Sequence, residues 1–133
     1  AHDLPRPEAA SAATLAGLVK DGGRVAGPEE VDFAVAVLTT RVRATNPRSS
    51  YLVGRHVGDG FAPDERAVLS RALDSGVAEY GPDTAAAALE VLAPDALCLR
   101  AGTGDTLAGV LRGAGYREVD EDGTCRFWLP WAD

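Results

Sequence analysis

The sequence predicts a single α+β domain, in which four or five helices pack on a small sheet that includes a C-terminal β-hairpin. Segments that start at Pro or acidic residues and stop at Gly, as helices do, alternate with short apolar runs typical of strands. Near the end, YREVDEDGTCRFWL places Asp-Gly between two strand-like stretches. The length of 133 residues is typical of one domain, so residues 8–133 are interpreted as a single unit.

The first third of the chain predicts an arm and two helices. Residues 1–7, AHDLPRP, contain two prolines and are expected to form a flexible N-terminal arm. Residues 8–20 then read as a helix that an Asp-Gly-Gly run ends. Residues 28–44 allow two interpretations, because their apolar residues also alternate as in a strand. We favour a helix, since Pro28 followed by two acids is a chemical start signal, and Pro47 limits it.

The middle of the chain predicts four elements before the last helix. They are, in order, a strand over 49–57, a helix over 63–76, a helix over 82–92 and a strand over 96–101. Gly76 is expected to cap the C-terminus of the first of these helices. Asp105 can cap the N-terminus of the last helix, and Gly115 follows as its C-terminal glycine.

The register of the C-terminal hairpin follows from its turn. Asp122-Gly123 fits the centre of a two-residue turn, and pairing outward from it places Arg117 opposite Trp128. These two side chains are expected on the outer face, as a cation–π pair worth roughly 0.5–1 kcal/mol. The opposite face is more apolar and should meet the helices. Its members are Tyr116, Cys125, Phe127 and Leu129.

The net charge of −7 limits the possible partners. Residues 67–133 carry 5 basic and 11 acidic side chains, so most of the negative charge lies there. This excess argues against nucleic acid and against anionic membrane surfaces. No apolar run reaches the roughly 20 residues of a membrane helix, and the first residues do not resemble a signal peptide. We expect a soluble cytoplasmic protein, and the single lysine among 13 basic residues fits a GC-rich bacterial genome.

The two cysteines do not predict a metal site. Cys98 and Cys125 are too few and too far apart for a zinc cluster. Both lie in apolar segments, which favours buried free thiols. A disulfide stays open as an alternative if their strands are neighbours. The acidic run 118–122 lacks the spacing of a calcium loop and is interpreted as a solvated turn.

Three residues are candidates for acid–base catalysis. His56 lies in YLVGRHVGDGF, residues 51–61, and histidine is the usual proton shuttle at neutral pH. Asp59, three residues later, could orient its imidazole. Glu90 is a candidate general base if its helix face meets a cleft. No G-x-S-x-G motif accompanies them, so a strand, a turn and a partly exposed histidine is the other interpretation.

The pattern Arg55-x-x-Gly58-x-Gly60 before a helix resembles the acyl-CoA pyrophosphate loop of the GNAT-type N-acetyltransferases. LCLRA, a helix ending LRGAGY, REV and a last strand are similar to the closing strand–helix–strand–strand order of that family. The resemblance covers about half of the chain. It implies that Arg55, Gly58 and Gly60 bind the pyrophosphate of an acyl-CoA cofactor at a helix N-terminus. It also implies Tyr116 as an acid near the thiol.

The segment FWLPWAD indicates an interface. Trp128, expected to face away from the core, and Trp131 lie near Arg117, and exposed Trp close to Arg is typical of the residues that dominate binding at protein interfaces. The other interpretation is that this tail folds back over the sheet. We therefore expect a small acidic accessory or binding domain without a cofactor, which docks a protein partner or a second copy, most simply as a homodimer. The alternative is a small enzyme acting on a small molecule or peptide, through His56 and Asp59 or through an acyl-CoA site. Whether the chain is an enzyme stays open.

Overall fold

The computed structural model describes residues 6–45, 54–57, 60–63 and 65–131. Within them the helices are α1 (Arg6–Gly17), α2 (Glu29–Leu38), α3 (Glu65–Ser75), α4 (Pro82–Leu92) and α5 (Thr106–Gly113). The strands are β1 (Arg24–Ala26), β2 (Arg43–Ala44), β3 (Gly54–Val57), β4 (Gly60–Pro63), β5 (Ala96–Arg100), β6 (Tyr116–Glu121) and β7 (Cys125–Pro130). Among the described residues no helix has the length and apolar character needed to cross a membrane.

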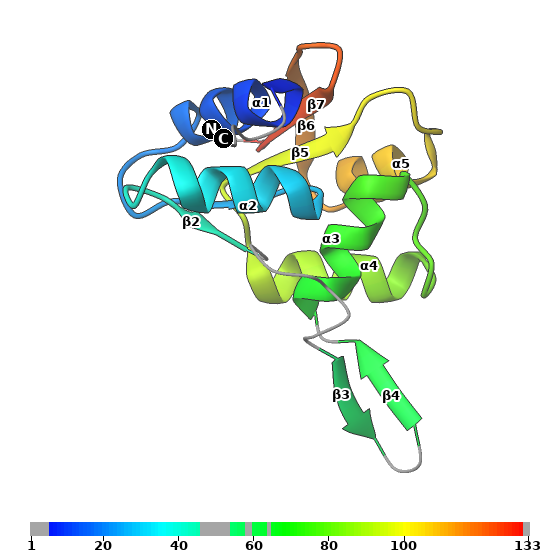
Figure 1. Cartoon of the computed structure of the whole chain (residues 1–133). Helices are drawn as coiled ribbons and strands as arrows, with labels where there is room; N and C mark the ends of the chain where they lie inside the picture. Colours follow the sequence, from blue (N-terminus) through cyan, green and yellow to red (C-terminus); the bar gives the residue numbers. More distant parts are fainter. Residues whose placement is uncertain (1–5, 46–53, 58–59, 64, 132–133) are drawn as a thin grey trace.

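The predicted α+β domain is confirmed. Five strands form one mixed sheet in the order β2-β1-β5-β7-β6, which includes the C-terminal hairpin (Figure 1). Strands β2, β1 and β5 are parallel, whereas β7 and β6 are antiparallel to their neighbours. Strands β3 and β4 pair only with each other, as a separate antiparallel hairpin.

Helices cover both faces of the sheet. One core cluster joins α1 and α2 to the sheet, and a second joins α3, α4 and α5 to its other face. The central strand β5 shows why: Ala96 and Cys98 belong to the first cluster, and Leu97 and Leu99 to the second. All four side chains are fully buried, as expected for a strand that is covered on both sides.

The helix favoured for residues 28–44 is confirmed only over its first part. Helix α2 starts directly after Pro28, as the start signal indicates, but it ends at Leu38 because Thr39 is extended, with φ −155° and ψ 150°. Residues 43–44 then form β2, which pairs with β1. At the N-terminus, α1 begins at Arg6, two residues inside the predicted arm, and residues 1–5 of that arm lie outside the described residues.

The predicted hairpin register is wrong. The turn contains three residues, 122–124, and a bulge between Glu118 and Asp120 shifts the strands. Trp128 therefore lies opposite Glu118, and Arg117 lies opposite Leu129. The shift moves Arg117 to the other face of the sheet, beside Leu129 and away from Trp128. Trp128 keeps its predicted face, but α3, α4 and α5 cover that face, so the side chain that we expected to be exposed is fully buried.

The expectation of free thiols is also wrong. Cys98 on β5 and Cys125 on the neighbouring strand β7 form a disulfide, with their Cα atoms 5.4 Å apart. This separation lies within the range that disulfides require. Both cysteines are fully buried beneath α1 and α2, and their bond links strands β5 and β7 covalently at the centre of the sheet.

Candidate functional site

Trp131 lies exposed at one end of the sheet. Pro130 ends β7, but the Trp131 N–H still donates to the carbonyl of Gly115, the residue before β6. This bond holds the backbone of Trp131 in line with the hairpin. The Trp131 side chain is 61% exposed, in contrast to that of Trp128, which is fully buried.

Arg117 covers the ring of Trp131. Its guanidinium carbon lies 4.7 Å from the ring centroid, a cation–π contact worth roughly 0.5–1 kcal/mol at an exposed site. The predicted contact of Arg117 with Trp128 is wrong, because the register differs. The Trp128 ring instead meets Arg112 and Arg126, at 5.3 and 5.5 Å. Two of the three predicted interface residues thus lie together on the surface, and the third belongs to the core.

Further apolar side chains accompany this pair. Leu129 lies opposite Arg117 in the register and is partly buried. Val119, at the bulge, is 39% exposed. We call the surface formed by Arg117, Val119, Leu129 and Trp131 the Trp131 rim. It combines an aromatic ring, a stacked cation and two aliphatic side chains at one edge of the sheet.

The rim adjoins an open strand edge with acidic side chains. Strand β6 is the last strand of the sheet, and within the described part of the chain it pairs with β7 alone, so the backbone groups of its outer side have no strand partner there. Every β6 side chain except Tyr116 is exposed. Glu118 forms an ion pair of 2.9 Å with Arg126 and raises the pKa of that arginine. Asp120 and Glu121 form no ion pair with any described residue, so the edge has a net negative charge.

The residues of the predicted loop at 55–60 lie on the separate hairpin. Arg55 and His56 belong to β3, where they pair with Ala62 and Phe61 of β4. Gly60 starts β4, while Gly58 and Asp59 lie outside the described residues. The following helix α3 begins only at Glu65, so a strand separates the glycines from a helix N-terminus. The catalytic roles of His56 and Asp59 and the acyl-CoA site stay predictions.

Glu90 lies on α4 and lines a cleft between α4 and α5. The cleft has a volume of about 490 Å³, and Tyr116 forms another part of its wall. The Tyr116 hydroxyl donates a hydrogen bond of 2.8 Å to the carbonyl of Pro94. Burial, with a smaller contribution from the negative charge of Asp95, raises the pKa of Tyr116 to about 12. The hydroxyl is therefore protonated at neutral pH and acts as a donor.

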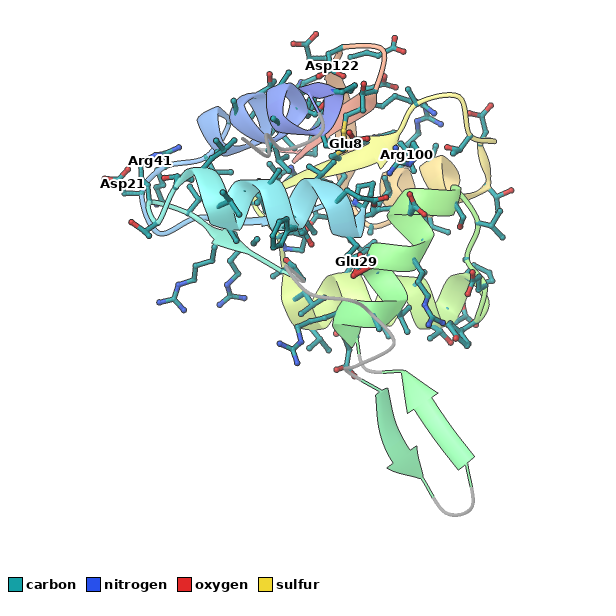
Figure 2. The ribbon with its side chains drawn as sticks, viewed as in Figure 1. Glu8, Asp21, Glu29, Arg41, Arg100 and Asp122 are labelled. Carbon is teal, nitrogen blue, oxygen red and sulfur yellow. A yellow bond between two sulfur atoms is a disulfide. The ribbon has the colours of Figure 1, made fainter. Side chains whose placement is uncertain are left out.

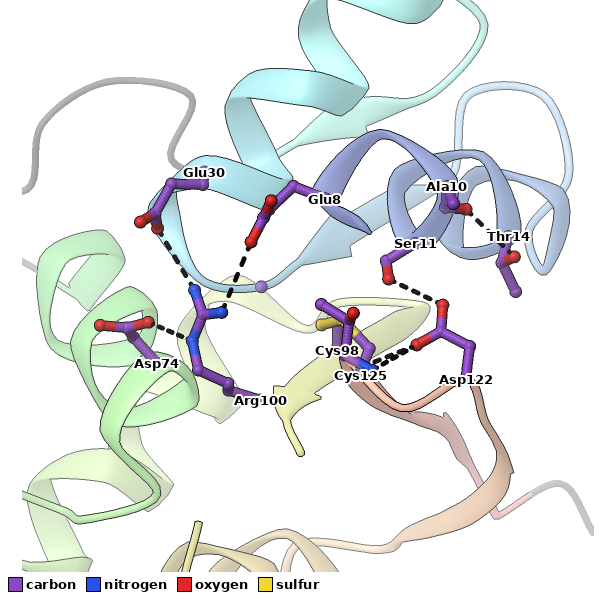
Figure 3. The surroundings of a disulfide bond; sticks show 12 residues. Glu8, Ala10, Ser11, Thr14, Glu30, Asp74, Cys98, Arg100, Asp122 and Cys125 are labelled. Atoms are coloured by element: carbon purple, nitrogen blue, oxygen red, sulfur yellow. Dashed lines mark hydrogen bonds and ion pairs between the residues drawn. A yellow bond between two sulfur atoms is a disulfide. The ribbon is translucent and has the colours of Figure 1, made fainter. Parts of the chain in front are cut away.

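Sequence reasoning missed one charged cluster, at the carboxyl end of β5. The Arg100 guanidinium lies 2.6 Å from Asp74, 3.4 Å from Glu30 and 3.7 Å from Glu8 (Figure 3). The carboxylates come from α3, α2 and α1, so Arg100 joins three helices to the central strand. Ligands commonly bind at such strand ends, but here three acids already surround the cation. We interpret the cluster as structural, and among the described residues no group of His, Cys, Asp and Glu could hold a metal ion.

Comparisons with known proteins add no assignment. No protein-family model, no curated protein and no solved structure matches this chain.

Proposed function

We propose that the chain is a small protein-docking domain that binds its partner through the Trp131 rim. One observation carries the proposal: Trp131 is 61% exposed while Arg117 holds its ring from one side. Trp and Arg are the residues that most often dominate binding energy at protein interfaces. A ring already held in place loses little side-chain freedom when it binds, which lowers the entropic cost of association.

The surroundings of the rim favour protein over other partners. Asp120 and Glu121 lie on the same edge, and their charge repels phosphate groups of nucleic acids and of anionic lipids. The same charge attracts a basic protein surface. A docking role also fits the open outer side of β6, which offers backbone donors and acceptors to a neighbour.

Cross-linking from the rim tests the proposal. A photo-activated benzophenone amino acid replaces Val119 in the full chain, and a control chain carries it in place of Val91, which is 63% exposed on α4. We expect protein adducts from position 119 that disappear when Trp131→Ala is added, and none from position 91. Equal adducts from both positions, or adducts that do not depend on Trp131, would count against a docking rim.

A second candidate function rests on the cleft between α4 and α5. Glu90 and Tyr116 both line this space of about 490 Å³, and because the Tyr116 hydroxyl already donates its proton to Pro94, Glu90 is the group available to a ligand. A small enzyme acting on a small molecule or peptide could use Glu90 as its general base. Native mass spectrometry with and without acetyl-CoA tests for a bound ligand, and the Glu90→Gln chain should lose a ligand held in this cleft. A Glu79→Gln chain is the control.

The compartment of the protein is a separate question. The cytoplasmic location expected from the sequence stays a prediction. The Cys98–Cys125 disulfide favours an oxidising compartment instead, because disulfides are rare in reducing cytosol.

A further inference from the structure

The two edges of the sheet carry opposite charges. Strand β6 at one edge presents Asp120 and Glu121, and strand β2 at the other edge presents Arg43 beside Arg24 of β1. None of these four side chains forms an ion pair with another described residue. A further base near β2, Arg41, is already paired with Asp21 at 3.2 Å (Figure 2). The molecule thus has an acidic edge and a basic edge with charges left unpaired.

The basic edge also contains a hollow. A cleft of about 230 Å³ is lined by Arg24, Arg43, Ala44, Thr45 and Leu92. The Arg24 guanidinium donates a hydrogen bond of 2.9 Å to the carbonyl of Leu92, which fixes one wall. The cleft therefore offers aliphatic surface between two cations. This is the environment that an aromatic ring prefers, because arginines stack on ring faces.

We propose that the partner of the Trp131 rim is a second copy of this chain, which receives Trp131 in the Arg24–Arg43 cleft. The inference rests on the proposed docking function and names its partner. Arg117 covers one face of the Trp131 ring, and the exposed face would meet the cleft of the next copy. The edge that bears Asp120 and Glu121 would then face the edge that bears Arg24 and Arg43, and the opposite net charges of the two edges attract one another.

This contact is head to tail. The rim and the cleft lie at opposite edges of one sheet, so a copy that offers its rim keeps its cleft free. Such contacts between unlike surfaces build closed rings or open filaments, in contrast to the two-fold dimer expected from the sequence. A two-fold contact of β6 against β6 would instead leave the Arg24–Arg43 cleft of both copies uncovered and its two cations without an acidic partner.

Charge exchange between the two edges tests the inference. Sedimentation velocity of the pure full chain should show concentration-dependent association that weakens as salt rises. Trp131→Ala should weaken this association at least about tenfold, while Val91→Ala leaves it unchanged.

The chain with Asp120→Lys and Glu121→Lys should be monomeric. The Arg43→Glu chain, in which no described side-chain bond is lost, should be monomeric too. Mixing these two chains should restore association, because opposite edges meet again. The reversal Asp83→Lys, on exposed α4, is the charge control.

The cross-linker at position 119 distinguishes the failure of this inference from that of the docking function. Adducts between two copies that map to residues 24, 43–45 or 92 support both. A pure chain that stays monomeric at all concentrations overturns the head-to-tail inference, and so does association that survives Arg43→Glu. Adducts to a different protein would then leave the docking function standing, whereas no specific adducts at all would overturn that function too.

Discussion

Ser11 Oγ donates a hydrogen bond of 2.7 Å to Asp122 Oδ2, across 111 residues of sequence (Figure 3). Asp122 Oδ1 accepts the backbone N–H groups of Thr124 and Cys125, at 2.9 and 2.8 Å. One carboxylate therefore closes the hairpin turn and ties that turn to α1. Partial burial acts to raise the pKa of Asp122, but these hydrogen bonds outweigh it and hold the pKa below its ordinary value.

This carboxylate predicts a pH dependence of stability. Because the folded pKa of Asp122 is lowered, its contribution is present above the ordinary aspartate pKa and is lost as the pH falls through the folded pKa. We expect Asp122→Asn to lower the free energy of unfolding by about 1 kcal/mol at neutral pH and by progressively less as acid protonates Asp122. Urea unfolding at a series of pH values measures this. An equal cost at neutral and at acid pH would contradict the ionic role.

Ser11→Ala separates the link to α1 from the turn. Ser11 is fully buried, and its replacement removes one bond to Asp122 while the two backbone bonds remain. We expect a cost of about 1 kcal/mol at neutral pH, measured by urea unfolding. Half-buried Thr14 gives the control Thr14→Ala, because the hydroxyl bond described for it goes to the carbonyl of Ala10 in its own helix. A control that costs as much as Ser11→Ala would remove the evidence for the long-range tie.

The disulfide should contribute strongly to stability. The cysteines are 27 residues apart in the sequence. A disulfide that closes a loop of this length restricts the unfolded chain and so raises the free energy of unfolding by about 3 kcal/mol. We expect Cys98→Ala together with Cys125→Ala to lower the free energy of unfolding by at least that amount, measured in urea without reductant. Thiol titration of the unfolded wild-type protein should find no free thiol. Two titratable thiols under these conditions would show that the bond does not form.

Helices were predictable because their signals are local. Gly76 has φ +75° at the end of α3 and Gly115 has φ +94° beyond α5, the left-handed conformation expected of C-terminal glycines. Asp105 lies at the N-cap of α5, although its side chain forms no capping bond. Short segments of sequence contain all of these signals, so no knowledge of the fold is needed to find them.

The predictions that proved wrong concern contacts between residues that are distant in the sequence. The bulge at Val119 depends on how β6 fits β7, and no turn motif encodes it, so Arg117 lies on the face opposite to the predicted one. The burial of Trp128 depends on helices α3, α4 and α5, which are distant from it in the sequence. Similarly, Arg100 meets acids that lie 26 to 92 residues away in the sequence. For the candidate site, the sequence predicted Arg117 and Trp131, which lie in contact with each other, and their role at an interface stays a prediction. The basic cleft near Arg43 could not be predicted from the sequence, because its walls come together only when β2 joins the sheet.

Two substitutions of Trp128 should lower the free energy of unfolding by different amounts. The ring is fully buried, and its Nε1 has no hydrogen-bond acceptor among the described residues. Trp128→Ala should cost about 3–5 kcal/mol through the cavity it leaves. Trp128→Phe should cost less than about 1.5 kcal/mol, because it also removes a buried donor that lacks a partner. Guanidinium unfolding followed by circular dichroism measures both. Equal costs would show that the indole N–H does find a partner.

Arg100 lies among three carboxylates that would repel one another in its absence. Burial alone would lower its pKa, but Asp74, Glu30 and Glu8 outweigh burial and raise it. We expect Arg100→Gln to lower the free energy of unfolding by about 2 kcal/mol at neutral pH, because removing one partner leaves the acids uncompensated. In that variant the three carboxylates repel one another, so the loss should be smaller in acid, where carboxyl groups carry less negative charge. Urea unfolding at pH 7 and pH 4 measures the change. Arg43→Gln, which breaks no described side-chain bond, is the control, and a loss that stayed constant with pH would show that packing rather than charge is responsible.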